Sequence, residues 1–315
     1  MILCVCPSPA VDVTYDVARL SVGATVRVTR VTRRPGGKAV NVARVLHAIG
    51  EPVHVLAPVG GTTGAEFAAG LAALGVPTTL VPSSCPTRST VTVVADDGTT
   101  TVLSEPAAVD CWDALREAVT ELVAHADVVV ASGRLPEGAP DDAFATVVEI
   151  ARAAGRPVVV DTSGPALLAA LAAGPTVVKP NADELAEIAG VADGSAPVAA
   201  AGRLAASSGA TVVASLGADG AVACTAGPAG ERAWHGRPAA PLAGNPTGAG
   251  DAAVAGIARA LRHDPHAASP PVELLRDAVA LGAAAVLSPV AGDVDAAHHA
   301  DQLAGVTVHE LADVR

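Results

Sequence analysis

Aromatic side chains are scarce in this chain, and acidic residues outnumber basic ones. Phe, Trp and Tyr make up 2% of the 315 residues, and the formal net charge is -12. Proteins that bind single-stranded nucleic acid stack bases on aromatic rings and neutralise phosphates with basic side chains. This composition therefore argues against nucleic acid as a partner.

Cysteines and long apolar runs are also few. The five cysteines are scattered and contain no C-x-x-C pair, which argues against a disulfide framework or a structural zinc site. The longest apolar run, 278–287, is too short to cross a bilayer. The first residues lack the basic and apolar segments of a secretion signal. We expect a cytoplasmic protein without a membrane partner.

The chain is 50% hydrophobic, a composition that suits one large or two unequal folded units. Apolar segments of strand length alternate with segments of helical periodicity along most of it. This alternation predicts an α/β fold built from βαβ units around a mostly parallel sheet. Two segments, about 13–35 and 88–104, instead alternate polar and apolar residues, which is typical of strands with one solvated face. We expect them to form a small lid sheet inserted in a single domain, 1–315.

The stretch 244–251 reads Gly-Asn-Pro-Thr-Gly-Ala-Gly-Asp, and the apolar residues at 254, 257, 258 and 261 that follow it predict a helix starting near Gly248. The unpaired N–H groups of that first turn would bind a phosphoryl group. Asp251 beside them could accept a proton from an attacking hydroxyl. A plain turn with a first-turn acid that favours the helix dipole explains the pattern equally well.

Lysine is nearly absent, and 18 of the 20 basic residues are arginine. The two lysines, Lys38 and Lys179, both lie in motifs marked by Gly or Pro, and a compact ammonium group is a usual phosphate ligand. Lys38 also belongs to a basic arc, residues 27–44, with six basic residues and no acidic one. The arc could attract a small anion, although a solvated basic face is an equal alternative.

Four other polar residues follow predicted strands or begin predicted helices. Asp12 follows the first strand, where ligands of α/β sheets bind, and Arg88 begins the second alternating segment. Asn181 and Glu184 share the first turn of a helix, where Glu184 could hold hydrated magnesium or simply favour the helix dipole. For each of them an ordinary structural role stays open.

In this order the motifs resemble those of the PfkB (ribokinase-like) carbohydrate kinases, over nearly the whole chain. The two specific signatures are Gly-Gly-Lys-Ala-Val-Asn-Val-Ala at 36–43 and Thr-Gly-Ala-Gly-Asp at 247–251. Further matches lie at 9–12, 132–136, 179–184 and 215–220. The resemblance is closest to the hexose-phosphate branch, which includes 1-phosphofructokinase and tagatose-6-phosphate kinase. It implies a ribokinase-like three-layer αβα core with a β-sheet lid.

The resemblance also implies a role for each matching residue. Asp251 would be the catalytic base, with the amides of Gly248, Ala249 and Gly250 as the anion hole. Lys38 and Arg88 would hold the phosphate that the substrate already carries. The full substrate set would be Asp12, Gly36, Gly37, Lys38, Asn41, Arg88 and Arg134. The set for ATP and Mg²⁺ would be Lys179, Asn181, Glu184, Ser215, Gly217, Gly220 and Ser288, with Glu184 as the metal ligand.

Three positions depart from the family pattern: Ala39 and Glu105 replace glycines, and Arg134 replaces a serine. Ala39 is compatible with the pattern if its φ is negative. Arg134 either points to solvent or adds a cation to the sugar-phosphate pocket.

The expected activity is ATP-dependent phosphorylation of a hexose phosphate, with fructose 1-phosphate as the first choice. Alternatives are 6-phosphofructokinase or tagatose-6-phosphate kinase activity, or a non-catalytic sugar-phosphate sensor on the same fold. The alternating lid strands also lead us to expect a homodimer.

Overall fold

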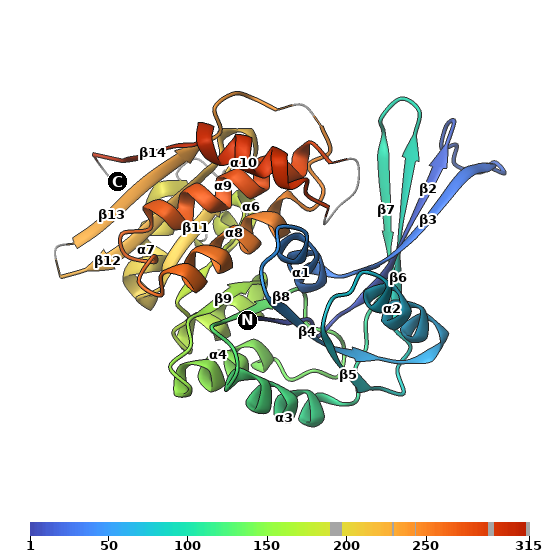
Figure 1. Ribbon diagram of the computed structural model, residues 1–315, viewed down its shortest axis with the longest axis horizontal. Coiled ribbons are helices and arrows are strands. Elements are labelled where there is room, and N and C mark those ends of the chain that lie inside the picture. The colour runs from blue at the N-terminus through green and yellow to red at the C-terminus, as the bar shows by residue number, and fades with distance from the viewer. Residues whose placement is uncertain (190–196, 229, 243, 289–292, 313–315) are drawn as a thin grey trace.

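The computed structural model describes residues 1–189, 197–228, 230–242, 244–288 and 293–312, in which a large sheet forms the core and a smaller sheet projects from it (Figure 1). The strands of the large sheet are, in spatial order, β14 (Thr307–Glu310), β13 (Gly230–Arg237), β12 (Ala221–Gly227), β11 (Thr211–Ser215), β10 (Val177–Val178), β9 (Val158–Asp161), β8 (Val128–Ser132), β1 (Ile2–Val5), β4 (Val53–Val59) and β5 (Thr78–Pro82).

The large sheet is parallel from β5 to β11 and antiparallel from β11 to β14. Consecutive residues of the central strand β1 enter opposite layers: Ile2 and Cys4 join one hydrophobic cluster, and Leu3 and Val5 join the other. Strands buried on both faces are continuous apolar runs, which is why β1 shows no alternation. The predicted mostly parallel sheet is confirmed.

Helices cover both faces of this sheet (Figure 1). One layer contains α1 (Lys38–Ala48), α2 (Gly61–Ala73), α8 (Ala249–His263), α9 (Val272–Val286) and α10 (Ala296–Gly305). The other contains α3 (Trp112–Val123), α4 (Ala143–Ala153), α5 (Gly164–Ala172), α6 (Ala182–Ala189) and α7 (Pro197–Ser208). A short 3₁₀ helix, η1 (Gly217–Asp219), follows β11. The expected three-layer αβα core is therefore present.

The smaller sheet takes its strands from two segments that are distant in sequence. Its spatial order is β3 (Val28–Gly36), β2 (Ala10–Val17), β6 (Arg88–Ala95) and β7 (Thr100–Ser104). At its base, Ala10 of β2 lies opposite both Gly36 of β3 and Arg88 of β6. This pairing brings residues from three parts of the chain to the edge of the core.

The longest apolar run lies mostly in α9, which packs along α8. The two helices approach closely at Gly256, where an added Cβ atom would lie 2.4 Å from Asp277 O. Among the helices that the structure describes, none combines the length and apolar character needed to cross a membrane. The apolar surface of α9 instead fixes α8 against the core.

Candidate active site

Polar residues gather where the parallel strands end. Ser132 ends β8, Asp161 ends β9, and Lys179 directly follows β10. The Ser132 hydroxyl donates a hydrogen bond to Asp161 Oδ2 at 3.0 Å. The carboxyl edge of a parallel sheet is the usual ligand site of α/β folds, so this edge is the place to look for chemistry.

Helix α8 begins at the same edge and carries Asp251 in its first turn. Gly248 has a left-handed conformation with φ 86°, and the helix starts at Ala249, within one residue of the predicted start. Asp251 is 8% exposed, and Asn41 Nδ2 donates to Asp251 Oδ2 at 2.9 Å. Burial, reinforced by the nearby Asp161 carboxylate, raises the pKa of Asp251 to about 6. At pH 7 this group is ionised and is a better base than an exposed aspartate.

The glycine turn before α8 is held by the end of α9. Asn245 N–H donates to Val286 O at 2.9 Å, and a Cβ atom on Gly244 would lie 2.0 Å from the same oxygen. Ala249 N–H donates to Pro246 O at 3.2 Å. The first turn of α8 has N–H groups without intrahelical partners, so an anion would bind there at the positive end of the helix dipole.

Asp161 was missed by the sequence analysis. Its side chain is 1% exposed and lies between both lysines of the chain: Lys38 Nζ is 3.4 Å from Oδ2, and Lys179 Nζ is 3.4 Å from Oδ1. Burial alone would raise the pKa of Asp161, but the two ammonium groups outweigh burial and hold that pKa below its usual range. A carboxylate at the end of a buried apolar strand is a sequence signal that could have identified Asp161, because the same signal identified Asp12.

Both lysines lie beside the start of α8. Burial lowers the pKa of Lys38, but the carboxylates of Asp161, Asp251 and Glu184 outweigh burial and leave that pKa raised. Lys179 is 4% exposed, and a Cβ atom on Gly250 would lie 3.6 Å from its ammonium group. Two cations therefore face the place where a phosphoryl group would bind.

Asp12 lies at the base of the small sheet, against Gly36. An added Cβ on Gly36 would lie 1.9 Å from Asp12 Oδ2, so glycine leaves the space that this carboxylate occupies. Burial raises the pKa of Asp12 to about 6, against the lowering effect of Arg44 and Arg88. The side chain is thus half-buried, and its pKa responds to two arginines, so it is not a free loop carboxylate.

Arg88 keeps its charge available, because the atoms that accept its hydrogen bonds in the described part of the chain are neutral. It donates to Ser8 Oγ at 3.2 Å, Thr90 Oγ1 at 3.2 Å, Ser104 Oγ at 2.7 Å and Glu105 O at 3.4 Å. An arginine in such surroundings suits an anionic ligand. Lys38 contacts Asp161 instead, so the two residues expected to share one phosphate have different partners.

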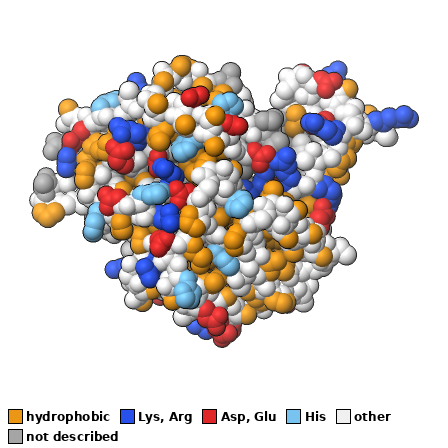
Figure 2. Space-filling view, in the orientation of Figure 1, with side chains coloured by type: hydrophobic (Ala, Val, Ile, Leu, Met, Phe, Trp, Pro, Cys, Tyr) orange, Lys and Arg blue, Asp and Glu red, His pale blue; other side chains and the backbone are white. Residues whose placement is uncertain are grey.

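The basic arc at residues 27–44 is largely neutralised by carboxylates from elsewhere in the chain. Figure 2 shows blue and red side chains together where the small sheet meets the core. The arc is therefore mainly a set of ion pairs that fasten β3 and α1 to other segments. These pairs are Arg30 with Asp16, Arg33 with Glu66, and both Arg34 and Arg44 with Asp293.

Asn181 and Glu184 form a reciprocal capping box at the start of α6. Glu184 N–H donates to Asn181 Oδ1 at 2.8 Å, and Asn181 N–H donates to Glu184 Oε2 at 2.9 Å. The motif thus has a structural role whether or not it binds a metal. The described residues contain no group of three or more His, Cys, Asp or Glu side chains arranged to hold a metal ion.

The turn 215–220 follows β11 next to this capping box. Ser215 N–H donates to Pro180 O at 3.2 Å. Gly217 has φ 61° with open space where a Cβ would point, whereas Gly220 has φ 85° and a Cβ there would lie 2.1 Å from Gly236 O. Gly217 therefore leaves a side of the turn open to a ligand, and Gly220 is required by the packing of β13.

Comparison with known proteins agrees with this arrangement. Residues 6–296 match the pfkB family of carbohydrate kinases. The chain belongs to this family. Escherichia coli phosphofructokinase-2, solved in complex with potassium, is 28% identical with a TM-score of 0.87, covering 96% of this chain and 98% of that one.

Two further solved structures have the same fold. The fructose-6-phosphate complex of Escherichia coli phosphofructokinase-2 is 28% identical with a TM-score of 0.84, again covering 96% of this chain and 98% of that one. A Thermotoga maritima protein described as a possible 1-phosphofructokinase is 22% identical with a TM-score of 0.81, covering 99% of both chains. At that lower identity the likeness concerns the fold alone.

The structure of this pfkB kinase accommodates its departures from the family pattern. Ala39 lies in α1, and no described non-glycine residue has a positive φ. Glu105 extends the pairing of β6 and β7, because its N–H donates to Ser89 O at 3.2 Å and its Oε2 accepts from Ser89 N–H at 2.7 Å. Arg134 is exposed beyond the end of β8.

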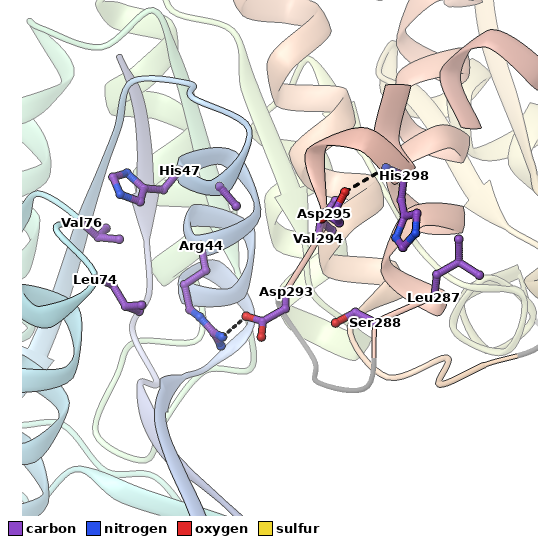
Figure 3. A pocket seen from close by; sticks show the side chains of 11 residues that line it. Arg44, His47, Leu74, Val76, Leu287, Ser288, Asp293, Val294, Asp295 and His298 are labelled. Carbon is purple, nitrogen blue, oxygen red and sulfur yellow. Dashed lines mark hydrogen bonds and ion pairs between the residues drawn. The ribbon is translucent and has the colours of Figure 1, made fainter. Parts of the chain in front are cut away.

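Ser288 lies in a hollow of about 450 Å³ between α1 and α10 (Figure 3). Arg44 and Asp293 form an ion pair across this hollow, and His298 points into it from α10. None of the described residues that line the hollow comes from the turn 215–220. The structure therefore does not place Ser288 with that turn in a common pocket.

We expect kcat/KM of this kinase to fall as the pH drops through about 6, because Asp251 accepts a proton only when it is ionised and its pKa is raised to about 6. Asp251→Asn should lower kcat by about 10²- to 10⁴-fold, the usual contribution of a general base. A pH–rate profile between about pH 5 and pH 8 checks the first expectation. A flat acid limb would contradict it.

Asp161→Asn should move the same acid limb to lower pH, because the Asp161 charge is one cause of the raised pKa of Asp251. The variant should also be slower, since Lys38 and Lys179 lose their shared carboxylate. Ser132→Ala is the matched control: it removes a hydrogen bond to Asp161 but keeps the charge. If the limb shifts equally in both variants, the electrostatic explanation is wrong.

Proposed function

We propose that this chain catalyses ATP-dependent phosphorylation of a hexose phosphate, with fructose 1-phosphate as the first-choice substrate. The main observation in support is that the charged residues form two separate sets. Asp251 and both lysines lie at the start of α8, and Arg88 lies at the base of the small sheet. The first group suits phosphoryl transfer, and the second suits an anion already present on the acceptor.

Asp251 is the proposed general base. Asn41 holds its Oδ2 atom, so the carboxylate is oriented, and its proton affinity is increased by burial. As the acceptor oxygen bonds to the γ-phosphorus, its proton passes to Asp251 and the bond from the γ-phosphorus to ADP breaks. The N–H groups of Gly248 and Gly250, together with Lys38, stabilise the charge on the transferred group. Ala249 N–H, expected to share this role, donates to Pro246 O and is less available for it.

The small sheet and α1 are the proposed sugar side. Gly37 has φ 102°, and a Cβ there would lie 3.0 Å from Ser8 O, so its backbone can lie where a side chain could not. Asp12 and Asn41 would bind sugar hydroxyls, and Arg88 would bind the existing phosphate. Arg134, exposed beyond β8, is a candidate second cation for that phosphate.

The residues at the strand ends fit MgATP. Magnesium is usually held by one or two carboxylates together with substrate phosphates, so a site with Glu184 as its protein ligand is sufficient. The Glu184 carboxylate is one cause of the raised pKa of Lys38, which supports a role near the proposed transfer site. When bound, the ion would neutralise phosphate charge. Lys179, Asn181 and the turn 215–220 would bind the nucleotide, with Ser288 at a more distant position.

Fructose 6-phosphate is a second candidate substrate, favoured by the Escherichia coli phosphofructokinase-2 structure in complex with it. Tagatose 6-phosphate is a third. A non-catalytic sensor would need the sugar-phosphate ligands but no general base. The oriented, buried Asp251 argues against that alternative.

The decisive measurement is ADP release from MgATP with fructose 1-phosphate, fructose 6-phosphate, tagatose 6-phosphate and free hexoses as acceptors. We expect one phosphorylated sugar to be preferred, because Arg88 would bind its phosphate. Arg88→Gln should raise KM for that sugar phosphate and leave KM for MgATP nearly unchanged. Preference for a free hexose would refute the hexose-phosphate assignment, and no turnover with any acceptor would leave the sensor alternative.

We further propose that the chain forms a homodimer through its small sheet. Val31 of the edge strand β3 and Leu103 of the edge strand β7 are 53% and 60% exposed. Exposed apolar side chains on edge strands favour pairing with a second copy. Light scattering should give twice the chain mass, and Leu103→Lys should lower that mass towards one chain. A monomeric mass for the unsubstituted chain would disprove the dimer.

A further inference from the structure

His235 is a buried polar residue without a place in the proposed mechanism. It lies in β13, is 8% exposed, and its Nε2 atom is 2.8 Å from Asp219 O. A carbonyl oxygen can only accept a hydrogen bond, so Nε2 carries the hydrogen in this contact. Asp219 is the last residue of η1, within the turn 215–220. His235 therefore holds the backbone of that turn from a neighbouring strand.

The next residue of β13 makes a second contact with the same turn. Gly236 O would lie 2.1 Å from a Cβ atom on Gly220, so the two backbones are in direct contact. The turn is closed internally by Leu216 N–H, which donates to Gly220 O at 2.8 Å. Two successive residues of β13 thus contact two successive residues of the turn, and its shape depends on β13 as well as on β11.

Two further side chains lie beside the His235 ring. His309 is its register partner in β14, and the two ring centroids are 5.7 Å apart at an interplanar angle of 51°. Arg237 Nε lies 3.4 Å from His235 Nε2, a longer contact than the one to Asp219 O. The shorter contact, from Nε2–H to Asp219 O, therefore sets the direction of the ring N–H group.

The turn lies on the phosphoryl-transfer side of the site. Its first residue, Ser215, is hydrogen-bonded to Pro180, which directly follows Lys179. Lys179 in turn pairs with Asp161. Asp12 and Arg88, the proposed sugar ligands, lie in the small sheet, which shares no strand with this part of the core. A change in the turn should therefore affect the nucleotide more than the sugar.

We propose that His235 is a positioning residue for the nucleotide: its N–H group holds the Asp219 carbonyl and so keeps the turn 215–220 in the shape that receives ATP. The inference rests on the proposed kinase function. A turn that is already ordered binds its ligand more tightly, because less conformational entropy is lost on binding. The effect should appear in nucleotide affinity and be nearly absent from sugar affinity.

The test uses three variants of the full chain. His235→Leu removes the donor at similar size, His235→Gln restores an N–H donor near the same place, and His309→Ala removes the neighbouring ring while keeping the hydrogen bond. We expect His235→Leu to raise KM for MgATP about two- to tenfold, the range of a single hydrogen bond, with KM for the sugar phosphate unchanged. His235→Gln and His309→Ala should resemble the unsubstituted enzyme.

Three results would overturn the proposal. The first is an unchanged KM for MgATP in a folded His235→Leu variant. The second is a parallel rise of the KM values for MgATP and for the sugar phosphate in that variant. The third is the same effect in His309→Ala as in His235→Leu. Melting temperatures measured in parallel separate these outcomes from general unfolding.

Calorimetric titration with MgADP, without sugar, separates this inference from the proposed function. If the unsubstituted chain binds MgADP but phosphorylates no acceptor, the kinase proposal fails, and weaker binding by His235→Leu still supports the role of His235. If the unsubstituted chain binds no nucleotide, both proposals fall.

Discussion

The rest of the site depends on the two ion pairs that the buried Asp161 carboxylate forms with Lys38 and Lys179. Two ammonium groups beside one another repel, and each loses hydration when it is buried. Asp161 lies between Lys38 and Lys179 and compensates both, while the same negative charge helps to raise the pKa of Asp251. One side chain thus keeps two cations at the start of α8 and leaves the neighbouring carboxylate more basic.

This charge cluster requires a rigid frame, because its members come from distant parts of the chain. Lys38 begins α1, Asp161 ends β9, and Asp251 lies in the first turn of α8. Parallel strands bring their carboxyl ends to one edge, and the helix that starts at that edge adds its unpaired N–H groups. Close packing of α8 on α9 at Gly256, and the contact of Gly244 with Val286 O, then fix the turn before α8.

Local features of the site were predictable because they depend on nearby residues. Positive φ angles at Gly37 and Gly248 require glycine, and both glycines come directly before helices whose starts could be read from periodicity. The alternating segments also identified the small sheet, since strands with one solvated face show a period of two. Partners of charged residues were not predictable. The acids that neutralise the basic arc, Glu66 and Asp293, are remote in sequence from the arginines they bind.

By itself the sequence determined the α/β class, the family and the helix that presents Asp251, because periodicity and glycine positions act over a few residues. Only the tertiary structure decided that Lys38 faces Asp161 while Arg88 faces neutral hydroxyls. It also decided that Asn181 and Glu184 cap a helix and that β13 holds the turn 215–220 through His235. These contacts depend on burial and on charges that the fold brings together from distant parts of the chain, and the spacing of residues along the chain encodes neither.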